Sequence, residues 1–158
     1  MIEYSDVRNA LDSGLRASEA GLVGSGSTWR VSTPQLIWIL HLDRLPYGHQ
    51  FGVDLGVHIK GLGGSTASLR PTDCPILLHL ENIPLSDGLE RTEIVRSLDL
   101  DADMPDEDRR LTIERVGSVL GAFVQSHGTL QDLRTAYAEG ALASAFIRKD
   151  ARTLLSEN

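Results

Sequence analysis

Two apolar runs on either side of a short turn-forming sequence are the clearest pattern in the chain. The first run, 36–45, is rich in large and β-branched side chains. In the second run every other residue is apolar: Phe51, Val53, Leu55, Val57 and Ile59. Between them stands the sequence Pro46-Tyr47-Gly48-His49. Alternation with a period of two is typical of strands, and Pro and Gly favour turns. The stretch 36–59 is therefore predicted to form a β-hairpin.

The register of this hairpin follows from which residues must be buried. A shift of one residue would send every apolar side chain of one strand to the wrong face. If Leu45 pairs with Gln50 across a four-residue loop, one face is continuously apolar. A register one residue tighter would place His41 among core residues and would remove Trp38 from them. We expect the first register, in which the core face is formed by Leu36, Trp38, Leu40, Leu42, Val53, Leu55, Val57 and Ile59.

The opposite face of the hairpin carries polar side chains. The expected register places His41 across from Asp54 and Ile37 across from His58. Opposed Cβ atoms lie about 5 Å apart, so the simplest interpretation of the first pair is a stabilising cross-strand contact. The alternative is a polar cluster, including Asp43, that orients a general base or holds a metal ion. The spacing matches no metal-binding motif. We therefore name His41, Asp54 and His58 as catalytic candidates and expect neither a metal nor a cofactor.

Apolar residues at helical spacing predict helices on both sides of the hairpin. The first covers residues 2–20, with Val7, Ala10, Leu11 and Leu15 on one face. A second runs from Asp106 to about Ser126, because Pro105 and the acids after it suit a helix N-terminus. Thr129 can cap a third helix. A last helix is predicted after Gly140, bearing Leu142, Ala145, Phe146, Leu154 and Leu155.

Two further strands are predicted, at 28–32 and 76–83. Trp29 lies in the first, and Pro34 separates it from the hairpin. In the second, His79 and Glu81 would share the polar face with His41, Asp54 and His58. Ile37 and Ile39 lie on that face too, so we expect a helix or a partner to cover part of it.

The order of helix, strands and helices indicates an α+β fold in a single domain, residues 1–158. We expect an antiparallel sheet of about four strands, with the N-terminal helix and the C-terminal group of helices packed on it. The Gly-rich stretches 21–28 and 60–75 are interpreted as loops. The first lacks the lysine and the preceding strand of a phosphate-binding loop.

Composition narrows the class of protein. The chain is 41% hydrophobic and 23% charged, as folded soluble domains are. The net charge of -7 and the two lysines argue against a nucleic-acid binder. An 18-residue apolar run and a basic leader are both missing, so we expect a cytoplasmic protein without a membrane span. Cys74 is the single cysteine, which leaves no intramolecular disulfide and favours a small buried side chain.

Residues 99–108 form the one acidic run. Its beginning resembles a calcium-binding loop, but Met104 stands in place of the turn glycine and Arg110 in place of the bidentate glutamate. The simplest interpretation is that the acids after Pro105 begin a helix. If the protein is a binding module, the run is also a contact surface for a basic protein partner. The predicted binding residues are Asp99, Asp101, Asp103, Asp106, Glu107 and Asp108.

The elements together resemble the bacterial domain of unknown function 4304. The resemblance covers nearly the whole chain: an N-terminal helix, a short strand with an aromatic residue, the hairpin, a Cys shortly before a strand, here Cys74, and a helical tail. Its most specific part is the hairpin, with Gln50-Phe51 and Asp54-Leu55-Gly56. The resemblance implies a fold, but it implies no activity and no catalytic residue.

Three functions are compatible with the sequence. The first is a binding module without catalysis, such as an immunity or inhibitor protein that covers a basic toxin or nuclease. The second is a small hydrolase in which His41 acts as base, Asp54 orients it and His58 or His79 completes the site. The third is a homo-oligomeric scaffold that uses the sheet edge at Trp29 or the exposed side of the hairpin. An enzyme would present a pocket into which His41, Asp54 and His58 point, whereas an inhibitor would present a convex acidic surface.

Overall fold

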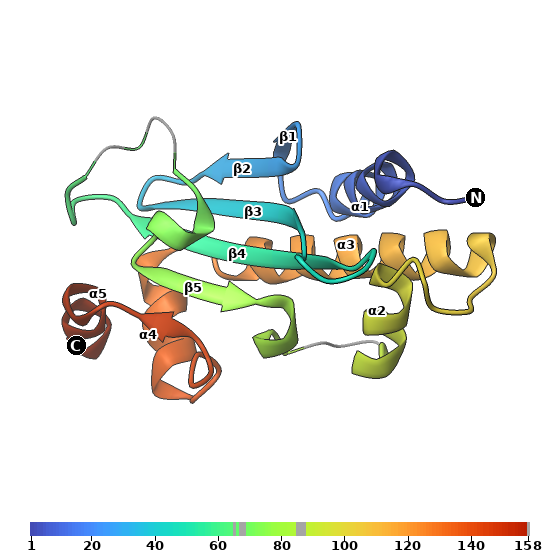
Figure 1. The fold of residues 1–158 in the computed structure, drawn as a ribbon. Helices are drawn as coiled ribbons and strands as arrows, with labels where there is room; N and C mark the ends of the chain where they lie inside the picture. The colour runs from blue at the N-terminus through green and yellow to red at the C-terminus, as the bar shows by residue number, and fades with distance from the viewer. Residues whose placement is uncertain (65, 67–68, 85–87, 158) are drawn as a thin grey trace.

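The computed structural model describes residues 1–64, 66, 69–84 and 88–157. Within this part of the chain, six antiparallel strands form one sheet in sequence order (Figure 1). The strands are β1 (Val23–Ser25), β2 (Thr28–Ser32), β3 (Leu36–Arg44), β4 (Phe51–Ile59), β5 (Ile76–His79) and β6 (Phe146–Ile147). The α-helices are α1 (Tyr4–Ala17), α2 (Arg91–Leu98), α3 (Asp106–Ser126), α4 (Leu130–Ala138) and α5 (Lys149–Ser156). Two short 3₁₀ helices, η1 (Pro71–Asp73) and η2 (Leu80–Asn82), flank β5.

The hairpin prediction is confirmed in both position and register. β3 and β4 pair from Leu36 opposite Ile59 to Arg44 opposite Phe51. Across the loop, the Leu45 N–H donates to the Gln50 carbonyl at 2.9 Å. The expected core face is buried throughout. The alternation of apolar residues was therefore sufficient to fix the pairing.

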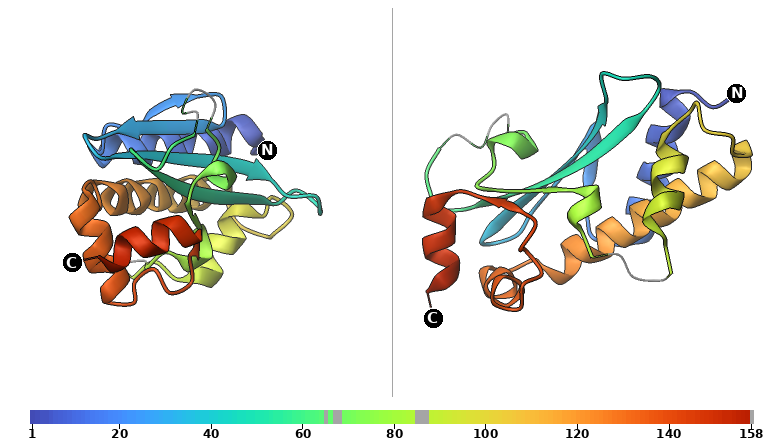
Figure 2. Two further views of the ribbon diagram at one scale, coloured as in Figure 1. Left: turned by 90° about the vertical axis from the view of Figure 1, so that its left-hand side faces the viewer. Right: turned by 60° about the horizontal axis from the view of Figure 1, so that its bottom comes forward.

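The buried face of the sheet packs against α1 and α3, and α3 runs along this side of the strands (Figures 1 and 2). The Trp29 indole donates to the Asp12 carboxylate of α1 at 2.8 Å. The Trp38 indole donates to the His127 carbonyl at 2.8 Å and meets the Phe123 ring edge-on, with centroids 6.0 Å apart. Both buried tryptophans thus satisfy their polar nitrogen within the core.

Helices α1 and α3 approach each other through glycines. A Cβ on Gly117 would lie 2.5 Å from the Leu11 carbonyl oxygen, and one on Gly14 would collide with the Glu114 carbonyl. Ser118 Oγ also donates to the Gly14 carbonyl at 3.2 Å. The two backbones are therefore in direct contact, which only residues without a Cβ allow.

Part of the second face of the sheet is covered by the segment 69–74, which includes the short 3₁₀ helix η1. Ile37, Ile39 and Cys74 form a small buried cluster, against which Leu69 packs. Gly56 lies directly beneath this cover, since a Cβ there would lie 2.6 Å from the Pro71 Cα. A glycine in the middle of β4 thus makes room for the 69–74 segment.

The sheet is larger than the four strands that the sequence predicted. One added strand, β1, lies in the Gly-rich stretch interpreted as a loop, where Val23 pairs with Arg30. The other, β6, pairs Ile147 with Ile76 and Phe146 with Leu77. Strands of three and two residues are too short to show an alternating pattern.

The helical predictions are mostly confirmed. α1 lies within the expected 2–20, α3 has the expected bounds, and Thr129 caps α4 by accepting from the Asp132 N–H at 3.1 Å. The helix expected directly after Gly140 is wrong, because turns and β6 come first and α5 begins only at Lys149. The strand expected to reach residue 83 ends at His79, where η2 takes over. α2 was not predicted.

Candidate functional site

Four polar residues form one row across the sheet, on the face opposite α1 and α3. Thr28 of β2 pairs with His41 of β3, which in turn pairs with Asp54 of β4. Asp54 also pairs with His79 of β5. Paired residues of an antiparallel sheet point to the same face, so the four side chains lie next to one another. We refer to these four residues as the polar row.

The hydrogen bonds of the polar row join β2 to β3 and β4 to β5. His79 Nδ1 donates to Asp54 Oδ1 at 2.5 Å, and His41 Nδ1 shares a hydrogen bond with Thr28 Oγ1 at 3.0 Å. The hydrogen bond of Asp54 thus goes to His79 and not to the expected His41. Because Nδ1 of His79 is bonded to Asp54, the second ring nitrogen, Nε2, is the one available to another group. The His79 side chain is 54% exposed.

The structure does not bring His58 into the polar row. His58 lies on the same strand and face as Asp54, but Gly56 stands between them, under Pro71. The His58 side chain is 5% exposed. Burial, and then the positive charges of Arg148 and Arg30, lower the pKa of its imidazole. His58 is therefore a buried residue of β4 whose neutral form is favoured.

Cys74 belongs to the covering segment and packs on Ile37 and Ile39. Burial, and secondarily the neighbouring Asp73 carboxylate, raise the pKa of its thiol to about 12. Because the thiolate is the nucleophilic form, Cys74 stays an unreactive apolar side chain. Its burial agrees with the interpretation from the sequence. Among the residues that the structure describes, no group of three or more His, Cys, Asp or Glu side chains is placed to hold a metal ion.

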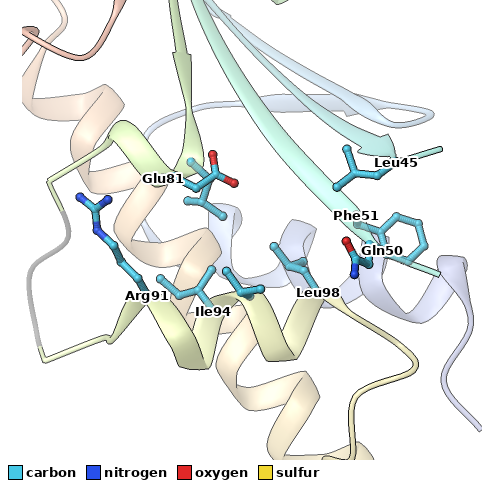
Figure 3. A pocket seen from close by; sticks show the side chains of 9 residues that line it. Leu45, Gln50, Phe51, Glu81, Arg91, Ile94 and Leu98 are labelled. Carbon is cyan, nitrogen blue, oxygen red and sulfur yellow. The ribbon is translucent and has the colours of Figure 1, made fainter. Parts of the chain in front are cut away.

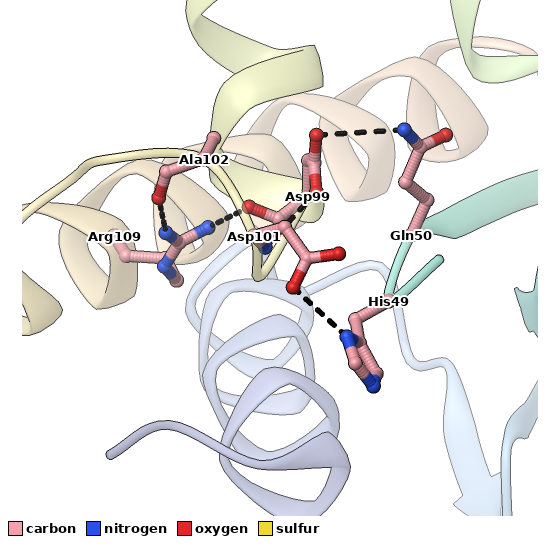
Figure 4. A network of polar contacts seen from close by, with 6 residues as sticks. All are labelled: His49, Gln50, Asp99, Asp101, Ala102 and Arg109. Carbon is pink, nitrogen blue, oxygen red and sulfur yellow. Dashed lines mark hydrogen bonds and ion pairs between the residues drawn. The ribbon is translucent and has the colours of Figure 1, made fainter. Parts of the chain in front are cut away.

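The acidic run begins in a turn that a buried arginine holds in place (Figure 4). Arg109 of α3 is 3% exposed. Its Nη1 donates to the carbonyls of Arg96, Ser97 and Asp99 at 2.8, 3.0 and 2.7 Å, and its Nη2 to that of Ala102 at 2.8 Å. Two of these carbonyls end α2, where the helix dipole favours a cation. One guanidinium therefore fixes both α2 and the turn.

Two of the predicted binding residues join this turn to the loop of the hairpin (Figure 4). Asp101 Oδ1 lies 2.9 Å from His49 Nδ1, and this hydrogen bond lowers the pKa of the Asp101 carboxyl. Asp99 Oδ2 accepts from Gln50 Nε2 at 3.4 Å. The backbone adds a bond from the Leu100 N–H to the His49 carbonyl at 3.0 Å. The turn and the hairpin loop consequently form one continuous surface.

The other four predicted binding residues are exposed along the turn and the first turn of α3: Asp103, Asp106, Glu107 and Asp108. The Asp106 carboxylate lies 3.5 Å from the amino group of Met1, and Glu107 lies 3.9 Å from Arg110. All six predicted binding residues thus belong to one end of the molecule. Their role in binding stays a prediction.

An apolar pocket of about 150 Å³ lies beside this surface (Figure 3). It is enclosed by α2, by η2 and by the ends of β3 and β4 next to the hairpin loop. The residues that line it are Leu45, Gln50, Phe51, Leu80, Glu81, Arg91, Ile94, Val95 and Leu98. Glu81 was expected on the face of the polar row, but it lies beyond the end of β5 and lines this pocket instead.

The negative charge of the chain is concentrated in the stretch of sequence that includes α2, one wall of the pocket. Residues 81–110, which we call the acidic segment, contain ten acidic and four basic side chains. They therefore hold six of the seven net negative charges of the protein. A field of one sign at one end of a molecule attracts a partner of the opposite sign.

Sequence reasoning missed the pocket because it missed α2. Ile94 and Leu98 have helical spacing, so this signal was present in the sequence. Leu45 and Phe51 were assigned only to the hairpin. That they meet α2 depends on the packing of segments that lie far apart in the chain.

Comparisons with protein-family models, curated proteins and solved structures find no match to this sequence. The resemblance to the domain of unknown function 4304 therefore stays a prediction. Within the described residues, every helix is too short or too polar to cross a membrane.

Proposed function

We propose that the chain is a non-catalytic protein-binding module whose acidic segment binds a basic partner. The observation that carries this proposal is that the acidic segment, with six of the seven net negative charges of the sequence, also supplies five of the nine residues that line an apolar pocket. An apolar centre with a polar rim is the usual composition of a protein interface. Opposite potentials also accelerate the encounter of two proteins.

The surface is ordered before any partner arrives. Arg109 fixes the turn through four backbone carbonyls, and His49 and Gln50 join it to the hairpin loop. Less conformational freedom is then lost on association, which favours affinity. A small acidic protein with such a surface suits an immunity or inhibitor type of role, in which it covers a basic toxin or nuclease.

The test compares the capture of partners by two variants of equal charge. The first, D103N/E107Q/D108N, neutralises three exposed acids of the acidic segment. The second, E19Q/E139Q/E157Q, neutralises three exposed acids elsewhere. We expect wild-type protein and the second variant to retain a basic partner from lysate of the source cells, and the first variant to lose most of it. Binding should weaken as salt is raised. Equal retention by both variants would contradict the proposal.

One contact favours a second candidate function, hydrolysis by a general base. A carboxylate that accepts from Nδ1 of a histidine sets the tautomer whose Nε2 can take a proton. The Asp54 and His79 pair has this arrangement, on an exposed part of the sheet. In this candidate His79 is the base, whereas the sequence pointed to His41.

A screen of ester, phosphoester and amide substrates tests the second candidate. Hydrolysis that is lost in His79→Gln and kept in His41→Gln would support it. The absence of turnover by the wild-type protein, or turnover that survives His79→Gln, would count against it.

A further inference from the structure

We propose that the apolar pocket beside the acidic segment receives one Phe-sized or Leu-sized side chain from a basic stretch of the partner protein. This inference rests on the proposed function and adds to it the chemistry of the segment that is bound. The bound segment carries an apolar anchor residue flanked by Lys or Arg.

The volume of the pocket sets the size of the anchor. The pocket measures about 150 Å³, and an apolar cavity of roughly this volume, lined by Leu, Ile and Phe, can hold a benzene molecule. A phenylalanine ring or a leucine side chain therefore fits, whereas an alanine would leave most of the space empty.

The pocket is preformed and open. Its floor consists of core residues that are each at most 6% exposed and come from three separate elements: Phe51, Leu80, Ile94 and Leu98. Val95 of α2 also lines the pocket and is 54% exposed, so this side chain can be reached from solvent. Since the floor is part of the core, an entering side chain meets apolar atoms without first displacing the protein's own.

The charged residues that line the pocket indicate which residues should flank the anchor in the bound segment. Glu81 and Arg91 line it together with the apolar side chains (Figure 3). Glu81 can accept hydrogen bonds from a Lys or Arg, and Arg91 can donate to a backbone carbonyl of a bound segment. The acidic segment as a whole favours a basic sequence by its net charge.

Three short peptides separate the two parts of the proposal. They are acetylated and amidated Lys-Lys-Phe-Lys-Lys, Lys-Lys-Ala-Lys-Lys and Glu-Glu-Phe-Glu-Glu. Each is titrated into the ¹⁵N-labelled protein and followed by amide NMR shifts. We expect the first peptide to bind at α2, η2 and the hairpin loop. Removal of the ring should weaken binding about tenfold or more, because burial of a Phe side chain is worth roughly that factor. The acidic peptide should bind least.

A pair of uncharged substitutions locates the anchor. Val95→Gln should weaken the first peptide severalfold and leave the alanine peptide unchanged. The control is Val23→Gln, at another exposed valine, in β1 at the edge of the sheet, and it should change the binding of neither peptide.

The outcomes are distinct for the pocket and for the proposed function. Equal binding of the Phe and Ala peptides would overturn the pocket inference while leaving the acidic surface intact. Equal binding of the Phe peptides with Lys and with Glu would contradict the basic partner and so the proposed function. Shifts confined to other parts of the surface, or no shift at millimolar peptide, would also overturn the pocket inference.

Discussion

Helix α3 contacts two other helices in two different ways. Against α1 the backbones touch, with Gly14 and Gly117 at the crossing. Towards α2 and the acidic turn, the same helix extends one buried arginine, Arg109, to four carbonyls. The first contact builds the core under the sheet. The second holds a strongly charged surface in place, together with the hydrogen bonds that join the turn to the hairpin loop.

Removal of Arg109 should have the largest effect on the second contact. In Arg109→Met four buried or half-buried carbonyls lose their donor, and each unsatisfied group of this kind costs about 1–3 kcal/mol. Because water can reach part of the turn, we expect the free energy of unfolding to fall by roughly 3 kcal/mol or more in denaturant titrations. The control Arg110→Met removes an exposed arginine next to it. Similar losses in both variants would contradict the role assigned to Arg109.

A methyl group on Gly117 should break the first contact. Alanine normally favours a helix over glycine, but here its Cβ would meet the Leu11 carbonyl oxygen at 2.5 Å. We expect Gly117→Ala to lower the free energy of unfolding by about 1–3 kcal/mol, as overpacking does. In Gly128→Ala the nearest atom would lie at 3.7 Å, so that variant should be close to wild type. A Gly117→Ala protein as stable as wild type would show that the helices are further apart.

Acid should weaken the covered face of the sheet before it affects either helix contact. The pKa of His58 is lowered in the folded protein by burial and by two arginines. Below its ordinary value of 6.5 the unfolded chain binds more protons, so the stability present above that pH is lost as pH falls. Denaturant titrations at pH 7.5 and 5.5 should show a smaller loss for His58→Gln than for wild type. An identical loss would mean that His58 does not contribute.

The smallest effect is expected at the junction of the hairpin loop and the acidic turn. His49→Gln removes the hydrogen bond that lowers the pKa of Asp101. An NMR titration should therefore find a higher pKa for Asp101 in the variant. Asp150, whose pKa is lowered by its hydrogen bonds to Arg148, serves as internal control and should not change. An unchanged Asp101 would show that the two groups are not bonded in solution.

Most of the fold could be read from the sequence, because its main elements carry strong local signals. The alternation between Phe51 and Ile59 determined the register, and Pro105 and Thr129 marked helix starts that the structure confirms. The short edge strands could not be predicted in this way. β1 and β6 exist because neighbouring strands offer them partners, not because of a pattern of their own.

The candidate site was predictable only in part. The sequence correctly predicted that His41 lies opposite Asp54. It did not predict that Asp54 bonds to His79, because this contact depends on the pairing of β4 with β5. It identified the six acids by composition alone. The pocket beside them is lined by Leu45, Glu81 and Ile94, which lie far apart in the sequence, so no local pattern could predict it.

A footprint of the captured partner tests the central claim most directly. Amide hydrogen exchange of the protein would be measured alone and in complex with the partner that it retains from lysate. We predict slower exchange in residues 88–110 and in the hairpin loop at 45–51, with little change in α4 and α5. Protection centred on the polar row around His79, with the acidic segment exchanging as fast as in the free protein, would contradict the claim.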